Sequence, residues 1–336
     1  MRIGVVGLGF MGSTHLQAYE KIGGAELAAV ASSDPKKLAG DLSGIGGNLE
    51  ARGAKLDFGD AKRYSTAEEL FADPAVEAVD LCLPTYLHAS MTSAALRAGK
   101  HVLVEKPMAL SGDECDGMIA AARSNGKVLM VAQVIRFWPD YVAARNIVNA
   151  GGIGTVRSAA FRRRCAAPAW SEWLRDRERS GGGAFDLLIH DFDYCVFLFG
   201  KPAAVSAAGY EDLEGGVDVV DCRLRYQDGP AVTVDGGWHN RGAYPFSMEF
   251  TIVGDDGVLE YHSGSRRLTL YRADGTQEEP SLPEADGFQG ELEAFLQACE
   301  QGQAPGDCRP EDSALSTRMT LAMRTSRENG GEAVAV

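Results

Sequence analysis

The sequence lacks the cysteine spacing that disulfide frameworks and structural zinc sites require. Its seven cysteines are an odd number, and no two of them form a Cys-x-x-Cys pair. Such frameworks and zinc sites are usually visible as closely spaced cysteine pairs. We therefore expect reduced thiols and no bound metal.

Positive charge and long apolar segments are scarce as well. The chain has 33 Lys and Arg against 47 Asp and Glu, which gives a formal net charge of -14. A protein that neutralises nucleic-acid phosphates needs a basic face, so we expect no nucleic-acid partner. No apolar run approaches the roughly 20 residues that cross a bilayer, and no apolar leader precedes the strand that starts at Ile3. These absences predict a cytoplasmic protein with no membrane partner.

What the sequence does contain is enough apolar material for two cores. Its 336 residues exceed the size at which one core usually stops growing, and 45% of them are hydrophobic. Residues 1–134 alternate short apolar runs with helical patterns, which is typical of a parallel sheet covered by helices. The strands predicted in this first domain lie at residues 3–6, 26–31, 79–83, 101–105 and 128–134.

Capping residues indicate where helices of the first domain begin. Thr66 with Glu69, and Ser111 with Glu114, have the spacing of a capping box, in which each side chain satisfies a free amide at a helix start. Two further helices are predicted at residues 13–22 and 87–98. A glycine-rich connection at residues 40–61 carries no readable role.

The pattern changes at about residue 135. A helical segment runs to about residue 150, and strand-like runs separated by turns follow without long helices between them. This pattern predicts an α+β domain, residues 135–308, with an antiparallel sheet. Its clearest strands are predicted at residues 156–161, 217–226, 231–238 and 246–253. A last helical segment, about 309–328, is a candidate for packing back on the first domain.

The most informative motif is the glycine loop that follows the first strand. Gly7, Gly9 and Gly12 have Gly-x-Gly-x-x-Gly spacing, with Phe10 and Met11 between the last two. Such a loop gives a tight turn and a close backbone approach to a pyrophosphate, while the following helix start offers free amides to the anion. The alternative is a purely structural loop. Because the motif lies between a strand and a helix, it predicts a dinucleotide site.

The second predicted strand ends where the ribose of a dinucleotide is recognised. NAD-binding proteins usually have an acid about 20 positions past the motif, whereas this chain has Ser32, followed by Ser33. No carboxylate at that position would repel a 2′-phosphate, and Lys36 and Lys37 are close behind. NADP is therefore slightly favoured, although Asp34 keeps NAD open. The two lysines are equally well explained as a solvated helix face.

Two more strands end in distinctive residues, on the side of an open α/β sheet where ligands bind. The first ends in Leu83-Pro84-Thr85, with His88 three residues on. His88 is either a cofactor contact or a residue that holds the loop by hydrogen bonds. The second ends in Glu105-Lys106-Pro107. The Lys106 ammonium could stabilise a developing alkoxide, and the alternative is an ordinary surface lysine.

The segment 181–193 is the richest in candidate chemistry, because its glycines precede an apolar helical run. Asp186 and His190 are four residues apart and share one helix face. A carboxylate so placed can orient an imidazole and stabilise its protonated form, as a general base requires. A histidine on a helix is more often structural. His190 with Asp193 could also suggest a metal, but no further ligands of recognisable spacing support one.

Aromatic and basic residues just before these glycines could line a sugar site, and the alternative is a solvated basic loop. They are Trp170, Trp173, Arg175, Arg177 and Arg179. An anionic sugar would give these arginines, and those at 162–164, a binding role.

In this order, the motifs resemble the glucose-fructose oxidoreductase, inositol dehydrogenase and rhizopine-catabolism (Gfo/Idh/MocA) family over essentially the whole chain. The features that carry the resemblance are the glycine loop, Pro84-Thr85 with His88, the run 99–102 leading into Glu105-Lys106-Pro107, Arg136-Phe137, and Asp186 with His190. The resemblance implies a Rossmann domain joined to an α/β domain with a large open sheet. It also implies a substrate held between the domains, and a homo-oligomer, dimer or tetramer, formed through that sheet.

The resemblance further implies NAD or NADP as cofactor and a sugar, polyol or related hydroxy or keto compound as substrate. Carried over, Lys106 would bond the reacting oxygen and contact the nicotinamide ribose, and His190 would be the acid/base. Asp186 would position the substrate or the histidine. We also assign Gln133 to the cofactor site. The substrate contacts expected with it are Arg136, Trp173 and Arg177.

Two other functions remain open at this point. One is an NAD-dependent glycosidase of the same family, which uses the dinucleotide as a transient oxidant. The other is a nonenzymatic dinucleotide-binding sensor. A sensor has no need for the proton-transfer set Lys106, Asp186 and His190, so an NAD(P)-dependent oxidoreductase is the principal expectation.

Overall fold

The computed structural model describes residues 1–47, 55–169, 171–240 and 242–336. They form two compact units, each made of two stretches of chain. The first unit comprises residues 1–134 and 288–314, and the second comprises residues 135–287 and 315–336. Residues 288–308, which the sequence pattern places in the second domain, thus belong to the first unit.

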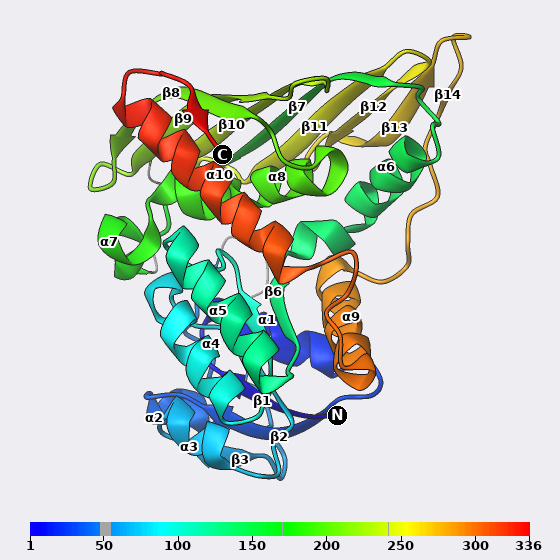
Figure 1. Cartoon of the computed structure of the whole chain (residues 1–336). Helices are drawn as coiled ribbons and strands as arrows, with labels where there is room; N and C mark the ends of the chain where they lie inside the picture. Colours follow the sequence, from blue (N-terminus) through cyan, green and yellow to red (C-terminus); the bar gives the residue numbers. More distant parts are fainter. Residues whose placement is uncertain (48–54, 170, 241) are drawn as a thin grey trace. The chain divides into compact units, whose positions relative to one another are not determined.

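The first unit is built on a six-stranded parallel sheet in the order β3-β2-β1-β4-β5-β6 (Figure 1). Its strands are β1 (Arg2–Val6), β2 (Glu26–Ala31), β3 (Lys62–Tyr64), β4 (Ala78–Leu81), β5 (His101–Glu105) and β6 (Leu129–Ala132). The strand order reverses between β1 and β4. Open α/β sheets bind ligands at such a reversal, outside the carboxyl ends of the strands.

Six helices of the described chain flank this sheet. They are α1 (Phe10–Tyr19), α2 (Pro35–Leu38), α3 (Ala67–Ala72), α4 (His88–Arg97), α5 (Gly112–Asn125) and α9 (Gly287–Gln301), with the 3-10 turn η1 (Thr85–Leu87). Side chains cap three of them, α2, α3 and α5. The capping box predicted at Thr66 and Glu69 is present at the start of α3. Ser111 caps α5 by accepting a hydrogen bond from the Glu114 amide at 3.2 Å, as expected.

The core of the first unit lies where its central strands meet the helices. All four residues of β4 are buried, as expected for a strand covered on both faces. Leu81 and Val104 are among the side chains with no exposed surface in this core. Burying one such side chain contributes about 1.5–3 kcal/mol, so the central strands are held rigidly and their ends make a fixed platform.

The second unit contains a nine-stranded sheet in the order β14-β13-β12-β11-β7-β10-β9-β8-β15. Its strands are β7 (Val156–Cys165), β8 (Ala204–Asp212), β9 (Val217–Arg225), β10 (Ala231–His239), β11 (Ser247–Gly254), β12 (Gly257–His262), β13 (Arg266–Arg272), β14 (Gln277–Glu278) and β15 (Val334–Ala335). Among these strands only β7 and β10 pair in parallel. The expectation of a large, mainly antiparallel sheet is confirmed.

Helices cover one face of this second sheet. They are α6 (Pro139–Asn149), α7 (Arg177–Ser180), α8 (Gly183–Phe199) and α10 (Pro310–Glu328), with the turns η2 (Val134–Phe137) and η3 (Glu172–Arg175). Figure 1 shows α8 and α10 along the same face. Tyr141 of α6 packs edge-to-face on Tyr194 of α8 and on Phe250 of β11, with ring centroids 4.8 and 4.9 Å apart. This aromatic contact joins helix layer and sheet.

Two buried ion pairs fix the orientation of α8. Arg163 of β7 donates to Asp191 at 2.8 Å, and Arg136 of η2 donates to Asp193 at 2.6 Å. All four side chains are at most 2% exposed. Removing one partner of such a pair leaves an uncompensated buried charge, which costs about 3–5 kcal/mol. The helix that carries Asp186 and His190 is thus rotationally fixed.

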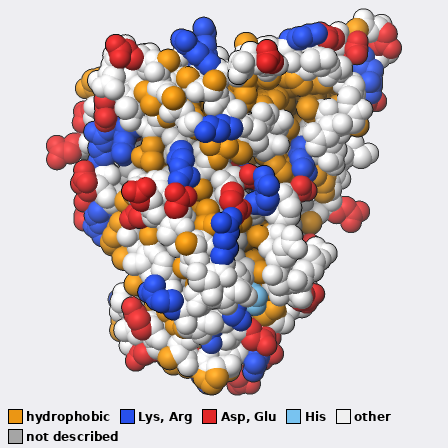
Figure 2. Space-filling model, in the orientation of Figure 1, with side chains coloured by type: hydrophobic (Ala, Val, Ile, Leu, Met, Phe, Trp, Pro, Cys, Tyr) orange, Lys and Arg blue, Asp and Glu red, His pale blue; other side chains and the backbone are white. Residues whose placement is uncertain are grey.

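The surface is charged and mixed. Figure 2 shows Lys and Arg side chains interspersed with Asp and Glu over the face in view. In the described part of the chain, no helix has both the length and the apolar character to cross a membrane.

Strand β3 and helix α9 are among the elements that the sequence pattern does not predict. Strand β3 is only three residues long and has no buried residue, so it lacks a hydrophobic signal. Helix α9 does have one, because Leu292, Phe295, Leu296 and Cys299 are buried and have helical spacing. Helix α1 also begins at Phe10, three residues before the predicted start.

Candidate functional site

The glycine loop after β1 has no room for a side chain at two positions. Gly7 has a φ of +93°, and a Cβ added there would lie 2.3 Å from the Cys82 carbonyl oxygen. A Cβ at Gly12 would lie 2.0 Å from the Gly7 carbonyl oxygen. At Gly9, by contrast, an added Cβ would meet nothing within 4 Å. The first and third glycines close the turn, and the second faces open space.

Helix α1 begins directly from this open position. Gly9 is its N-cap residue and makes no side-chain cap. The first amides of a helix have no partner within the helix, and with the helix dipole they favour an anion at this end. Phe10 and Met11 are half-buried, and the Phe10 ring packs over Gly47. The loop and helix start together form a cradle suited to a pyrophosphate.

The residues that follow β2 are polar, and the first of them, Ser32, has a hydroxyl and not a carboxylate. The Ser32 hydroxyl accepts a hydrogen bond from the Asp34 amide at 3.2 Å. Asp34 caps α2, with Oδ1 accepting from the Lys36 amide at 2.9 Å. Ser33 is exposed and Lys37 is half-buried. One Asp34 oxygen is thus engaged in capping, and a hydroxyl and a lysine lie beside it.

The end of β4 is held by His88. This residue is fully buried, with Nδ1 2.7 Å from the Pro107 carbonyl oxygen and Nε2 2.8 Å from that of Leu83. Burial lowers the pKa of His88, although the two carbonyl acceptors favour the protonated ring. These contacts agree with the reading in which His88 holds the loop. Thr85 is buried and Pro84 half-buried on the same turn.

The ends of β5 and β6 supply further polar groups. Glu105 is buried and its Oε2 accepts from the backbone amide of Lys106 at 3.0 Å, while Lys106 itself is half-buried. Gln133, just after β6, is 1% exposed. Neither its Oε1 nor its Nε2 has a hydrogen-bond partner in the described chain. A buried amide in that condition is costly, which fits a group that binds a polar ligand.

The predicted acid/base pair lies on α8 in the second unit. Asp186 is in the first turn of that helix, His190 follows four residues later, and both are half-buried. Residues 187–189 between them are buried, so the pair forms a polar stripe on an otherwise apolar helix. Their assignment to proton transfer stays a prediction.

The predicted substrate contacts have other partners within the second unit. Arg136 is buried against Asp193 and stacks on the Phe197 ring at 4.6 Å. Trp173 packs against the apolar cluster that contains Trp238. Arg177 forms ion pairs with two glutamates. Trp170 lies outside the described residues.

The strand arginines are likewise neutralised by neighbouring carboxylates. Arg162 pairs with Asp235 at 2.6 Å, and Arg164 lies 3.6 Å from Glu249. Arg163 is buried with its own partner on α8. These pairings leave the idea of an anionic sugar without support.

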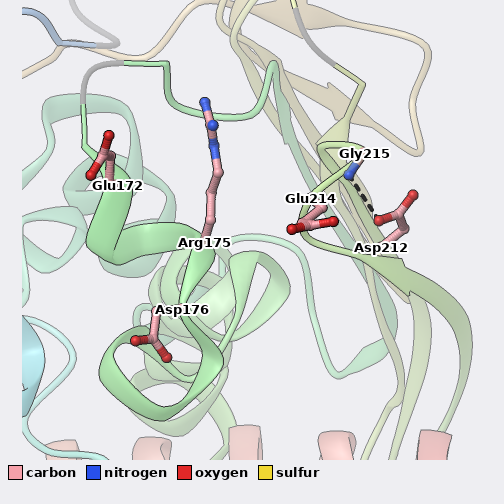
Figure 3. A pocket seen from close by; sticks show the side chains of 6 residues that line it. All are labelled: Glu172, Arg175, Asp176, Asp212, Glu214 and Gly215. Atoms are coloured by element: carbon pink, nitrogen blue, oxygen red, sulfur yellow. Dashed lines mark hydrogen bonds between the residues drawn. The ribbon is translucent and has the colours of Figure 1, made fainter.

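A cavity of about 610 Å³ lies beside the segment that precedes α8. Figure 3 shows side chains from η3 and from the N-cap residue of α7 on one side, and residues at the end of β8 and in the turn that follows it on the other. Its lining residues are Glu172, Arg175, Asp176, Asp212, Glu214 and Gly215. With four carboxylates and one guanidinium, this cavity disfavours anions. Trp173 and Arg177 do not line it.

The first unit also contains a buried group of polar side chains that the sequence pattern does not reveal. His15 of α1 and Asp80 of β4 are both fully buried and 2.8 Å apart, and the Cys82 thiol lies 3.5 Å from the same ring nitrogen. Distant parts of the chain meet here, so no local spacing announces them.

The first unit fits a nicotinamide dinucleotide on two observations. The space at Gly9 admits a close anionic group, and the Gln133 amide is buried without a partner in the described chain. Glycines 7, 9 and 12 with the start of α1 would hold the pyrophosphate. The ends of β2, β4 and β5 would hold the remainder.

Comparison with known proteins agrees with this assignment. Residues 1–133 match the oxidoreductase family with an NAD-binding Rossmann fold, and residues 141–260 match the GFO/IDH/MocA C-terminal domain. The chain is 27% identical to myo-inositol 2-dehydrogenase of Thermotoga maritima over 342 residues, which cover 98% of this chain and 96% of that protein. It is 30% identical to 1,5-anhydro-D-fructose reductase of Ensifer adhaerens over 282 residues, which cover 81% and 84%.

A solved structure has the same fold. It is a levoglucosan dehydrogenase in complex with NADH and levoglucosan, with a TM-score of 0.84 and 24% sequence identity. The match covers 100% of this chain and 99% of that one. Because both its Rossmann and its C-terminal parts are matched, the chain belongs to the Gfo/Idh/MocA family of NAD-binding oxidoreductases.

Proposed function

We propose that this oxidoreductase exchanges a hydride between a nicotinamide dinucleotide and a hydroxyl-bearing carbon of a sugar, polyol or related compound. The observation that carries the proposal is the Asp186–His190 pair on α8, in a chain whose other unit has a glycine loop open at Gly9. The relatives support the substrate class, because inositol, anhydrofructose and levoglucosan are all polyhydroxy compounds.

In the proposed reaction, each of three side chains has its own role. When bound, the dinucleotide accepts or supplies the hydride. His190 removes the hydroxyl proton during oxidation and returns it during reduction, and Asp186 stabilises the protonated ring. Lys106 donates a hydrogen bond to the reacting oxygen and stabilises the charge that develops there. General acid–base catalysis of this kind contributes about 10²- to 10⁴-fold in rate.

A cofactor titration followed by a substrate screen tests the proposal. The purified full chain is titrated with NADH and NADPH, and sugars and polyols are then screened for absorbance change at the nicotinamide band. We expect net reduction of the dinucleotide by at least one polyol. Sugar release without net absorbance change would instead identify a glycosidase. Binding without turnover across the whole panel would identify a sensor.

We propose that NADP is preferred over NAD. Ser32 presents a hydroxyl where a carboxylate would repel a 2′-phosphate, and Asp34 uses one oxygen to cap α2. Lys37 lies half-buried on the same short helix and would supply a positive charge. Two negative groups about 4 Å apart repel by about 4 kcal/mol at the protein surface before salt screening, so one carboxylate can decide the preference.

The substitution Ser32→Asp should therefore reverse the preference. We expect the ratio of NADPH to NADH affinity to fall by about 10- to 100-fold, because the added carboxylate repels the 2′-phosphate and bonds the 2′-hydroxyl of NADH. Fluorescence titration of both reduced cofactors measures it. Ser281→Asp, at an exposed serine, is the matched control for the added charge. Equal NADPH binding by the Ser32→Asp protein would contradict the proposal.

We also propose that the chain forms a homo-oligomer through the second sheet. On β7, Ala160 and Arg162 alternate with buried residues and lie exposed on the sheet face opposite the helices. Light scattering on the full chain should give a mass that is a multiple of 35.8 kDa. A monomeric mass at micromolar concentration would contradict the proposal.

A further inference from the structure

The buried polar group in the first unit surrounds one imidazole ring. His15 is on α1, one helical turn after Gly12, and its Nδ1 lies 2.8 Å from Asp80 Oδ2. On the opposite side of the ring, Nε2 lies at ion-pair distance from two carboxylates, 3.3 Å from Glu105 Oε1 and 3.6 Å from Glu291 Oε1 of α9, without hydrogen-bond geometry to either. A single side chain thus links α1 to β4, β5 and α9.

The ring carries a positive charge in this setting. Burial, the largest single effect, lowers the pKa of His15, but the charges and hydrogen bonds of Asp80 and Cys82 together hold that pKa well above the usual value of 6.5. The other groups that face the ring are the Cys82 thiol, Glu105 and Glu291, and the buried Tyr19 hydroxyl interacts with Asp80 and Cys82. Burial raises the pKa values of Cys82 and Tyr19, so both stay protonated at neutral pH.

Glu291 is the second unusual member of the group. It is fully buried, and neither carboxyl oxygen has a hydrogen-bond partner in the described chain. Burial raises its pKa well above the usual 4.5, in spite of His15, and the charges of Glu105 and Asp80 add to the increase. Burial thus disfavours the charged form of Glu291 at this position.

Glu105 connects this group to the proposed site. One of its oxygens faces His15 and the other accepts from the Lys106 backbone amide at 3.0 Å. Neutralising His15 would leave a buried carboxylate facing Asp80 across an uncharged ring. Glu105 would then move, and its hydrogen bond to Lys106 would move with it.

We propose that His15 is a positioning residue that bridges Asp80 and Glu105, and so holds the end of β5 where Lys106 begins. The inference rests on the proposed role of Lys106 in the reaction. A misplacement of about 1 Å at a reacting group can cost about 10²-fold in rate. The effect of His15 should therefore be much larger on kcat than on cofactor affinity.

The test compares His15→Gln with wild type in single-turnover hydride transfer, using whichever polyol the screen yields. We expect a loss of about 10²-fold in rate with cofactor Kd changed by less than about threefold. His262→Gln, at a histidine on β12 in the other unit, is the matched control. A Kd loss as large as the rate loss would overturn the proposal.

A double-mutant cycle with Lys106→Met separates this inference from the proposed function. If His15 acts through Lys106, His15→Gln should cost little more, less than about threefold, in a Lys106→Met background. Multiplicative losses would overturn the positioning role and leave the proposed function standing. Full activity of Lys106→Met alone would overturn the role of Lys106 itself.

The variant Asp80→Asn keeps the proposal testable if His15→Gln does not fold. Removing the carboxylate removes a charge that raises the pKa of His15, so the ring should lose its proton at a lower pH than in wild type. Turnover of the variant should therefore begin to fall at a lower pH than turnover of wild type. Parallel pH profiles would overturn the proposal, as would a stoichiometric metal ion found on the wild-type protein.

Discussion

His190→Ala should lower kcat by about 10²- to 10⁴-fold, because general acid–base catalysis supplies about that much. The dinucleotide is proposed to bind the first unit, whereas His190 is on α8 of the second. Cofactor Kd should therefore stay within about threefold of wild type. Steady-state turnover and cofactor titration on the same preparations measure the two quantities.

Two further variants make this result specific. Asp186→Asn keeps the shape of the side chain and removes its charge, so it should reduce kcat less than His190→Ala does and lower the pKa seen in the rate profile. Thermal unfolding checks that α8 is intact in each variant. Unchanged turnover in His190→Ala would contradict the assignment of His190 as the acid/base.

Gly9→Ala should abolish tight dinucleotide binding without disturbing the fold. The added methyl group meets no protein atom within 4 Å, and the Gly9 φ of −89° suits alanine. The methyl would instead occupy the space proposed for the pyrophosphate. We expect Kd to rise at least about 100-fold, since clashes or lost contacts worth about 2.7 kcal/mol suffice for that change, and Tm to stay unchanged.

Gly12→Ala provides the contrast, and Gly23→Ala the control. A Cβ at Gly12 would meet the Gly7 carbonyl oxygen at 2.0 Å, so this variant should lose about 1–3 kcal/mol of stability as well as binding. Gly23 is exposed, with no atom within 4 Å of an added Cβ, and should change neither quantity. Normal cofactor affinity in Gly9→Ala would show that no pyrophosphate lies at this loop.

The parts of the fold that the sequence predicts are those with local signals. The spans Glu26–Ala31 and His101–Glu105 match their predicted strands because β-rich apolar runs end there at polar residues. The capping box at Thr66 is likewise a short-range interaction. Strand β3 is invisible because it is short and solvated, and its pairing with β2 is decided by tertiary context.

The residues of the candidate site likewise include some with a local sequence signal and some without one. Gly7, Gly9 and Gly12 are recognisable in the sequence because residues close together in the chain determine the conformation of a turn. The linkage of His15 to Asp80, Glu105 and Glu291 depends on four separate elements, and no spacing in the chain encodes it. The pairing of Arg136 with Asp193 is hidden for the same reason, since the two residues are 57 positions apart.

The return of residues 288–314 to the first unit constrains how the protein is made. A ribosome that has synthesised residues 1–134 has not yet supplied α9, whose Leu292 and Phe295 are fully buried. The dinucleotide-binding unit therefore reaches its final form only after nearly the whole chain has emerged. A fragment cut at residue 134 would leave His15 and Glu105 without Glu291 beside them, so the two halves of the family pattern are not independent folding modules.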